Sequence, residues 1–379
     1  LQILKSCGFV VKIGAESQDL LVADTKKELM TLLKRASEAI TTDDVTLKLG
    51  PNEYLGHYTD FLLENFDAGK ANLLVSPPGT GKTELVKSLS NKKRVLLVLP
   101  YISVIDAKVV RDNDLGENFD AYFGTAKVSD IKKGKSAVMT LDKFGRIDID
   151  KIAYMYDYIM IDESHLIFTS SFRLEAMANS LKNIKQLIQM SKLDEYSARV
   201  VLMTGTPTGE VPYFGFYQNL NHIKVRKEEK RSKTAEFVIC SDVRDMQAKI
   251  SIQIAECLRN KKKVLYPTNA GDVQAAKLVG MVEHQLGRTV RWSYYKKANC
   301  NSEMATSINE NATIGDYELV LASNYLSVGI DIKDIQDFEC IYDASFAGYE
   351  IEQFNCRLRN VDIHSKIYIP LYDGEGNIM

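Results

Sequence analysis

Cysteine pairs, long apolar runs and an excess of charge of one sign are all missing from this sequence. Its six cysteines are scattered without a Cys-x-x-Cys pair, which argues against a disulfide scaffold or a zinc ribbon and suits a reducing cytosol. No run approaches the roughly 18–20 consecutive apolar residues that a membrane span needs. With 48 basic and 50 acidic residues, a globally basic nucleic-acid coat protein is excluded, although a local basic groove is not.

The composition is that of an ordinary folded protein. A hydrophobic fraction of 45% and a charged fraction of 26% exclude a disordered or collagen-like chain. The 379 residues suit two domains. The first residue is Leu and no signal peptide is recognisable, so we expect a piece of a longer chain in the cytoplasm, or in the host cytoplasm if the chain is phage-encoded.

Short, strongly apolar runs alternate with amphipathic stretches from Tyr54 onwards. Such runs predict an α/β fold with buried parallel strands that helices cover on both faces. The predicted strands are residues 71–76, 95–100, 136–139, 158–161, 200–203, 236–240, 263–267, 319–322, 338–342 and 367–371.

Capping, turn and charge signals predict the boundaries. A capping box at 25–28 precedes apolar residues at helical spacing, so we expect a helix near 25–40. A Gly-Pro-Asn turn ends the N-terminal segment, and a stretch rich in lysine and arginine predicts a linker. We therefore predict a segment of unassigned role, with the tail of an upstream domain as one candidate, a first domain, a linker and a second domain, at 1–49, 50–223, 224–234 and 235–379.

The octapeptide Ser-Pro-Pro-Gly-Thr-Gly-Lys-Thr follows one predicted strand and opens a predicted helix over 83–90. Its two glycines let backbone N–H groups turn around phosphates, Lys82 brings a charge to the β- and γ-phosphates, and Thr83 offers a hydroxyl to Mg²⁺. The general pattern has Gly where Ser76 stands. A chance glycine turn is the alternative, which the flanking strand and helix disfavour. The predicted ATP-binding residues are Ser76, Pro77, Pro78, Gly79, Thr80, Gly81, Lys82 and Thr83.

A second motif ends the predicted strand at 158–161 in two carboxylates. Phosphoryl transfer needs one carboxylate to hold Mg²⁺ and another group to orient and deprotonate the attacking water. Asp162 and Glu163 suit these roles in that order, whereas an ordinary strand-end turn is the alternative. Zinc at His165 is disfavoured, because no other histidine or cysteine stands at ligand spacing from it.

From about Tyr54 to its end, the chain resembles superfamily 2 helicases of the DExH type. Residues 76–83 resemble motif I, Asp-Glu-Ser-His at 162–165 motif II, and Thr-Gly-Thr-Pro at 204–207 motif III. The remaining matches are 98–100 for motif Ia, 139–140 for the next strand-contacting segment, 264–269 for motif IV, 323–331 for motif V and 353–359 for motif VI. The finer likeness is to helicases of phage, plasmid and viral replication.

Motif VI departs from the family pattern Gln-x-x-Gly-Arg-x-x-Arg. Cys356 replaces the glycine and Asn360 stands at the last arginine position, while Arg357 keeps the first. The resemblance implies two tandem RecA-like domains with parallel sheets flanked by helices, which hold Mg²⁺-ATP between them. It implies catalytic roles for Lys82, Asp162, Glu163, Arg357 and Gln353. It further implies nucleotide contacts from Gly329, Asp331 and Arg359, and metal contacts from Thr83 and Asp162.

The same resemblance places motifs Ia, IV and V near a nucleic-acid backbone. Hydroxyls and backbone amides can hold a strand there without reading its sequence. The predicted nucleic-acid contacts are Pro100, Thr140, Thr268 and Ser323. The aromatic stretch around Trp292 is a candidate stacking platform, but packing within the second domain is the favoured interpretation.

The resemblance implies an ATP-dependent helicase or translocase, an ATP hydrolase with ATP and Mg²⁺ as cofactors, acting in DNA replication or repair. Nucleic acid is the expected partner, with DNA favoured over RNA, together with replication proteins and no membrane. Two alternatives stay open. A P-loop ATPase that remodels a protein partner would leave motifs V and VI unexplained. A nucleotide-gated binding module without hydrolysis would have no use for Glu163 and Arg357.

Overall fold

The computed structural model describes two compact parts of the chain, here called unit 1 (up to Glu228) and unit 2 (from Glu229). The residues that it describes are 45–105, 115, 118–122, 124, 134–169, 174–216, 219–227, 233–296, 302–323, 326, 332–333, 338–343, 345–346, 348–358 and 362–372. The predicted helix near 25–40 lies outside these residues. Nowhere in this set is there a helix long and apolar enough to cross a membrane.

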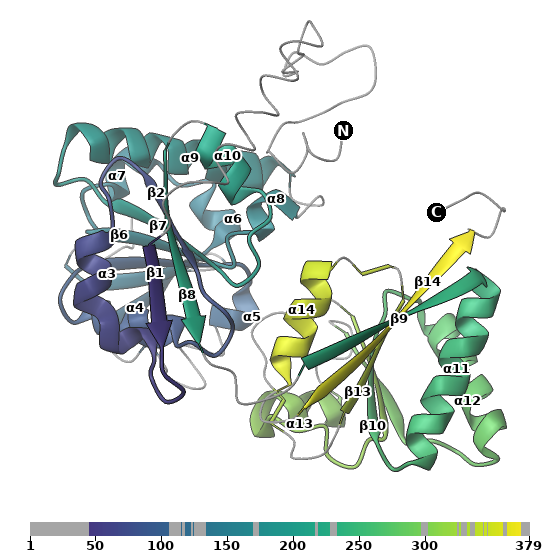
Figure 1. Cartoon of the computed structure of the whole chain (residues 1–379). Coiled ribbons are helices and arrows are strands. Elements are labelled where there is room, and N and C mark those ends of the chain that lie inside the picture. Colours follow the sequence, from purple (N-terminus) through teal and green to yellow (C-terminus); the bar gives the residue numbers. More distant parts are fainter. Residues whose placement is uncertain are drawn as a thin grey trace, which may run out of the picture. The chain divides into compact units, whose positions relative to one another are not determined.

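Unit 1 is built on one sheet of parallel strands (Figure 1). Among the described residues the sheet has eight strands in the order β1-β8-β2-β7-β6-β3-β5-β4. The strands are β1 (Val45–Leu49), β2 (Ala71–Val75), β3 (Val95–Leu99), β4 (Phe119–Tyr122), β5 (Ser136–Thr140), β6 (Tyr158–Asp162), β7 (Arg199–Thr204) and β8 (Leu220–Lys227). The helices are η1 (Leu55–Tyr58), α3 (Thr59–Asn65), α4 (Lys82–Ser90), α5 (Ile102–Ile105), α6 (Leu141–Phe144), α7 (Ile149–Ile152), α8 (Leu166–Thr169), α9 (Leu174–Leu193) and α10 (Glu210–Phe216).

The central strands of unit 1 are buried on both faces. Residues 159 and 161 of β6 belong to the core that lies towards α6, α7 and α9, while Met160 faces the opposite side and is equally buried. Two buried faces explain why these strands are apolar runs without alternation, as the sequence predicted.

Unit 2 repeats the architecture with a smaller parallel sheet. Among its described residues the strand order is β11-β12-β10-β13-β14-β9. The strands are β9 (Lys233–Asp242), β10 (Lys263–Pro267), β11 (Trp292–Tyr295), β12 (Leu319–Ala322), β13 (Phe338–Asp343) and β14 (Ile363–Tyr372). The helices are α11 (Val243–Arg259), α12 (Asp272–Leu286), α13 (Glu303–Asn311) and α14 (Gly348–Arg357).

Helices cover both faces of the unit 2 sheet, with α11 and α12 on one side and α13 and α14 on the other (Figure 1). Each face has its own apolar cluster. Ile250, Ile254 and Leu278 belong to the first, and Ile308 and Phe354 to the second. Two helix-flanked parallel sheets in tandem are the fold class that the sequence predicted.

Two predicted boundaries differ from the strands that the structure describes. Residues 45–49, which the sequence assigned to the N-terminal segment of unassigned role, form β1 and pair with β8. Residues 224–227, expected in the linker, end β8, and residues 233–234 begin β9, so that only 228–232 remain between the strands, outside the described residues. The charges of Lys224 and Arg226 hid a strand whose alternate residues Ile223 and Val225 are buried.

Candidate functional site

The loop between β2 and α4 has the backbone shape that a phosphate-binding loop needs. Gly79 and Gly81 both adopt left-handed conformations, with φ of +80° and +87°. A Cβ at Gly81 would lie 2.9 Å from the Cβ of Tyr54, so both conformation and space require glycine there. Lys82 begins α4, and its ammonium donates to the carbonyl oxygen of Ser76, 3.1 Å away. The lysine charge and the first N–H groups of α4 are therefore both next to the loop, where a phosphate would bind.

Ser76, which replaces the usual first glycine, is fully buried in this loop. Its hydroxyl is hydrogen-bonded to the Thr80 hydroxyl, which in turn donates to the Pro77 carbonyl at 2.7 Å. The backbone N–H of Ser76 donates to the carbonyl of Thr204 at 2.8 Å. The substitution thus gives the loop an internal hydrogen bond that a glycine could not make.

Two residues from distant parts of unit 1 hold the outer side of the phosphate loop. The Lys227 ammonium lies 4.1 Å from the centre of the Tyr54 ring and donates to the carbonyls of Glu53 and Gly79, at 3.0 and 3.3 Å. The Leu55 N–H donates to the Thr80 carbonyl at 2.9 Å. The contacts of Tyr54 and Lys227 with this loop were not predictable from the sequence, because no local motif connects these residues with residues 76–83.

Strand register brings the acidic motif to the same edge of the sheet as the phosphate loop. Val75 of β2 pairs with Thr204 of β7, and Met203 of β7 pairs with Asp162 of β6. The carboxyl ends of β2 and β6 are therefore two strands, or about 10 Å, apart. This is the edge at which open parallel sheets bind ligands.

Asp162 and Glu163 have different surroundings. Asp162 is the last residue of β6, is buried, and accepts the backbone N–H of Glu163 at 3.1 Å. Glu163 is one of the described non-glycine residues with a positive φ, +50°. A strained backbone conformation of this kind, directly after a strand, is typical of functional positions.

A buried polar network links this motif to the loop after β7. The Nδ1 atom of His165 lies 3.0 Å from the Thr204 hydroxyl and 3.5 Å from a Glu163 carboxylate oxygen. The Ser164 hydroxyl donates to Glu210 at 2.7 Å, and the same carboxylate accepts the Thr208 N–H at 2.9 Å. Residues 162–165 and 204–210 are therefore one hydrogen-bonded assembly.

The donors at this edge suit a magnesium ion shared with a nucleotide. Thr83 supplies a hydroxyl and Asp162 a carboxylate, both oxygen ligands of the kind that Mg²⁺ prefers. The described residues contain no group of three or more histidine, cysteine or acidic side chains that would hold a metal by themselves.

Pro100 and Thr140, predicted to contact nucleic acid, lie at the carboxyl ends of adjacent strands of unit 1: Pro100 follows β3, and Thr140 is the last residue of β5. Leu99 of β3 pairs with Thr140 of β5, which places both residues at the edge that carries the phosphate loop. The Thr140 hydroxyl is buried and accepts the backbone N–H of Lys143 at 3.3 Å, as the N-cap of α6. A nucleic-acid strand that reached Thr140 would therefore meet the N-terminus of α6 rather than a free hydroxyl.

Unit 2 brings its two predicted contacts, Thr268 and Ser323, together in the same way. Pro267 of β10 pairs with Ala322 of β12, and the Thr268 N–H donates to the Ala322 carbonyl at 2.8 Å. The Thr268 hydroxyl is buried and accepts the N–H of Ala270 at 3.1 Å, whereas Ser323 is only partly buried. The loop after β10 is thus shaped by Thr268 itself.

The aromatic stretch around Trp292 belongs to the core of unit 2 rather than to a stacking surface. Tyr294 and Tyr295 of β11 are buried, and Trp292 packs against the same apolar cluster as α11 and α12. The Tyr294 hydroxyl donates to the carbonyls of Thr268 and Ala270, at 3.0 and 2.8 Å. These residues support the loop after β10 from behind.

Arg357 is the last residue of helix α14 and lies next to Ile332, the residue that directly follows motif V. Its carbonyl accepts the N–H of Ile332 at 2.7 Å, and Ile332 forms a parallel bridge with Leu358. Gln353 lies in the middle of α14. The predicted nucleotide contacts Gly329, Asp331 and Arg359 lie outside the described residues.

Comparison with known proteins agrees with this geometry. The family model of the type III restriction enzyme res subunit matches residues 31–209, just under half of the chain. Among curated proteins, no sequence matches significantly.

Solved helicase structures share the fold at low sequence identity. S. cerevisiae Dbp5 bound to RNA and ADP BeF3 superposes with a TM-score of 0.56 and 12% identity, over 89% of this chain and 87% of that one. The Escherichia coli DEAH/RHA helicase HrpB gives 0.55 and 14%, over 84% of this chain and 42% of HrpB. The Mycobacterium smegmatis helicase Lhr, bound to ssDNA and AMP-PNP, gives 0.53 and 14%, over 89% of this chain and 47% of Lhr.

These matches show what the chain is similar to. The fold is that of two tandem RecA-like domains, as in these helicase structures, and the matches support the resemblance to superfamily 2 helicases. The family match includes both the phosphate loop and the acidic strand end.

Proposed function

We propose that this chain is an ATP-dependent helicase or translocase that hydrolyses Mg²⁺-ATP and moves along a DNA or RNA strand, in DNA replication or repair. One observation carries the proposal: the register of β2, β7 and β6 brings the phosphate loop and the Asp-Glu pair to one edge of a parallel sheet. The helicase fold of both units supports it. The RNA and ssDNA in the Dbp5 and Lhr structures favour nucleic acid as the partner.

In this proposal the phosphate loop binds ATP, and the acidic pair at the end of β6 catalyses its hydrolysis. The N–H groups at the start of α4 and the Lys82 ammonium hold the β- and γ-phosphates. Glu163 orients the attacking water and takes its proton. Thr83 and Asp162 would hold Mg²⁺, which neutralises charge that develops on the phosphates.

Unit 2 supplies the second half of the function. The backbone at Thr268 and Ser323 holds the sugar-phosphate chain together with Pro100 and Thr140 of unit 1, without reading bases. Arg357, with Gln353 on the same helix, completes the site when the two units close on ATP, and Gly329, Asp331 and Arg359 add nucleotide contacts. Cycles of ATP binding and hydrolysis then close and open the two units and move the protein along the nucleic-acid strand.

The test is an ATPase assay with single-stranded DNA, duplex DNA and RNA as separate activators. Lys82→Ala should abolish turnover, because it removes the charge that holds the β- and γ-phosphates. Lys87→Ala is the matched control, since Lys87 is exposed on the same helix, about one and a half turns further from the loop, and should retain wild-type turnover. Wild-type activity in Lys82→Ala would refute the nucleotide site.

Strand displacement from 3′- and 5′-tailed duplexes separates a helicase from a translocase and gives the polarity. Binding that rests on backbone phosphates should weaken steeply with salt and show little sequence preference. ATP hydrolysis that no nucleic acid stimulates would favour the alternative of an ATPase that remodels a protein partner. Nucleic-acid binding that depends on ATP but proceeds without hydrolysis would favour the nucleotide-gated module.

A further inference from the structure

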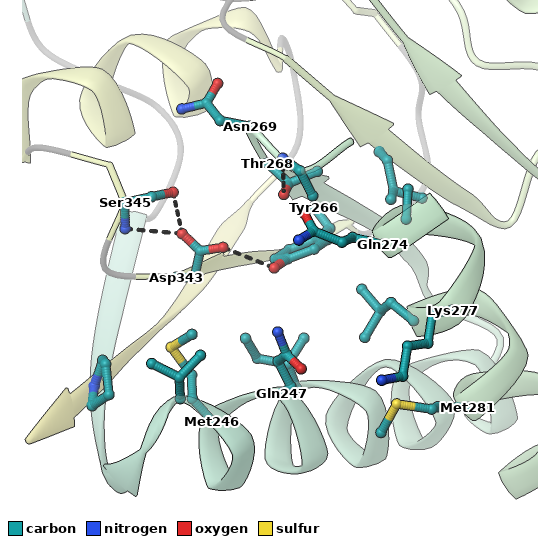
Figure 2. Close-up of a pocket in the computed structure, with 17 residues that line it drawn as sticks. Met246, Gln247, Tyr266, Thr268, Asn269, Gln274, Lys277, Met281, Asp343 and Ser345 are labelled. Carbon is teal, nitrogen blue, oxygen red and sulfur yellow. Dashed lines mark hydrogen bonds between the residues drawn. The ribbon is translucent and has the colours of Figure 1, made fainter. Parts of the chain in front are cut away.

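A cavity of about 530 Å³ opens in unit 2 between α11, α12 and the carboxyl ends of the sheet strands (Figure 2). This volume is within the range of small-molecule sites, about 300–1,000 Å³. Thr268 and Asn269 of the loop after β10 line it, so it adjoins the segment proposed to hold a nucleic-acid backbone. The nucleotide site does not account for it, and the part of motif IV in its wall was predicted to contact only a nucleic-acid backbone.

The floor of the cavity is apolar and buried. Ile250 and Leu321 are at most 1% exposed, and Met246 and Leu278 are at most 9% exposed. The Met246 side chain, and that of Met281 at the rim, are flexible thioethers that adapt to the face of a flat ring. A floor of this kind favours a ligand with an apolar face.

The rim carries amides whose hydrogen-bonding groups are available. Gln247 projects from α11 into the cavity, below Tyr266 in the view of Figure 2. Within the described part of the chain, the side-chain amides of Gln247 and Asn269 have no hydrogen-bond partner, and the Gln274 side chain uses only its oxygen, which accepts the Gly271 N–H at 3.3 Å. Amides both donate and accept, so they match a ligand edge that alternates donors and acceptors.

The charges around the cavity disfavour an ionic ligand. Asp343 is already engaged: it accepts the Tyr266 hydroxyl at 2.9 Å and both the N–H and the hydroxyl of Ser345. Burial, together with the Asp343 charge, raises the pKa of Tyr266, so this phenol stays protonated as a donor to Asp343. Among the described residues that line the cavity, Lys277 is the one cation and Asp343 the one anion, so their charges balance.

We propose that this cavity binds a nucleobase, with the ring face on the apolar floor and the ring edge on the amides of Gln247, Asn269 and Gln274. A base of the bound strand is favoured over a free nucleoside, because Thr268 belongs both to the cavity wall and to the proposed backbone track. The inference rests on the proposed function and adds base contacts to a recognition mode that otherwise uses only the backbone.

The experiment compares the wild-type chain of residues 1–379 with Gln247→Trp, whose indole would fill the cavity from its exposed edge. Ile252→Trp is the matched control: it adds the same ring to an exposed position of α11, five residues further along the helix and not part of the cavity wall. Fluorescence anisotropy with a short oligothymidylate should give an affinity about tenfold weaker for Gln247→Trp and unchanged for Ile252→Trp. A circular dichroism melt establishes that each variant is folded.

Two further arms test the chemistry of the ligand. Strands with an abasic position scanned along their length should lose affinity at one register for wild type and at none for Gln247→Trp. An iodouracil at that register should photocrosslink to peptides of α11 or α12. Competition by free thymidine monophosphate at the affinity of the strand would assign the cavity to free nucleotides instead.

The outcomes separate the two proposals. If wild type binds no strand at all and no free nucleotide occupies the cavity, both the helicase function and the nucleobase site fall. If wild type binds strands but tolerates every abasic position, and Gln247→Trp binds as tightly as Ile252→Trp, the nucleobase site alone is refuted.

Discussion

The Nδ1 atom of His165 lies 3.0 Å from the hydroxyl oxygen of Thr204, and both side chains are fully buried. This contact joins the end of β6, which carries the acidic pair, to the end of β7. The Thr204 hydroxyl also accepts the N–H of Thr206 at 3.1 Å, so one oxygen holds both loops. Since a buried polar group is costly without its partner, a change at either residue should affect the other.

A double-mutant cycle with His165→Ala and Thr204→Val should reveal this coupling. Each single change should lower the free energy of unfolding of unit 1 by about 1–3 kcal/mol, because each leaves a buried partner unsatisfied. The double variant should cost less than the sum, with a coupling energy of about 0.5–3 kcal/mol in urea denaturation. Thr59→Val combined with His165→Ala is the control. Thr59 is also buried but bonds to Gly56 and Ser88 instead of His165, so these two losses should add. Additive losses for His165 and Thr204 would contradict the link.

The fold was predictable where strands are buried on both faces. β6 and β10, for example, are short apolar runs, and the predicted and observed limits agree within one residue. β1 and β8 escaped prediction because they lie towards the edge of the sheet and alternate apolar residues with lysine or arginine. A charged edge strand looks like a linker when composition alone is considered.

The candidate site also has a part that was predictable from the sequence and a part that was not. The phosphate loop and the acidic pair are contiguous in sequence, so their chemistry could be predicted from residue type and spacing. Lys227 contacts the phosphate loop across 148 positions, and only the sheet order brings them together. Motif IV supplies only part of the cavity wall in unit 2, and the rest comes from two helices and other strand ends that no motif connects.

Glu163 should show opposite effects on stability and on activity. A non-glycine residue in the left-handed region costs about 1 kcal/mol, so Glu163→Gly should raise the thermal stability of unit 1 while abolishing ATP hydrolysis. Glu163→Gln keeps the strain and loses only the base, so it should bind ATP, fail to hydrolyse it and gain no stability. Lys261→Gly is the matched control in unit 2: at φ +59° it should gain stability and retain ATPase activity. Normal hydrolysis by either Glu163 variant would remove Glu163 from the mechanism.

Gly81→Ala should weaken nucleotide binding at least about tenfold. The new Cβ would require φ near +87° and would meet the Tyr54 Cβ at 2.9 Å, so the phosphate loop must move. Isothermal titration calorimetry with a non-hydrolysable ATP analogue measures the loss. Gly280→Ala, within α12 and with open space around its Cβ, should instead stabilise unit 2 by about 0.5–1 kcal/mol and leave nucleotide affinity unchanged. Equal nucleotide affinity in Gly81→Ala and wild type would show that the loop tolerates a side chain.

Arg357 offers the sharpest test of a mechanism that needs both units. It ends α14 in unit 2, whereas the phosphate loop belongs to unit 1, so its guanidinium can act on ATP only if the two units close on the nucleotide. Charge develops on the γ-phosphate as it leaves, and an arginine directed at that charge is worth about 10³–10⁵ in rate in related phosphoryl-transfer enzymes. Arg357→Ala should therefore bind ATP almost normally and lose most of its nucleic-acid-stimulated hydrolysis. Nucleotide titration and stimulated ATPase assays on the same preparation separate the two effects.

Arg357→Lys and Arg359→Ala sharpen the result. Lysine keeps the charge but not the planar fork of donors, so Arg357→Lys should recover little of the lost rate. Arg359→Ala should lose less than Arg357→Ala, because Arg359 stands one residue before the last arginine position of the family pattern. A larger loss at Arg359 would move the arginine role to that residue. Full stimulated activity in both alanine variants would mean that unit 2 contributes no arginine to hydrolysis, and the two-unit mechanism would have to be abandoned.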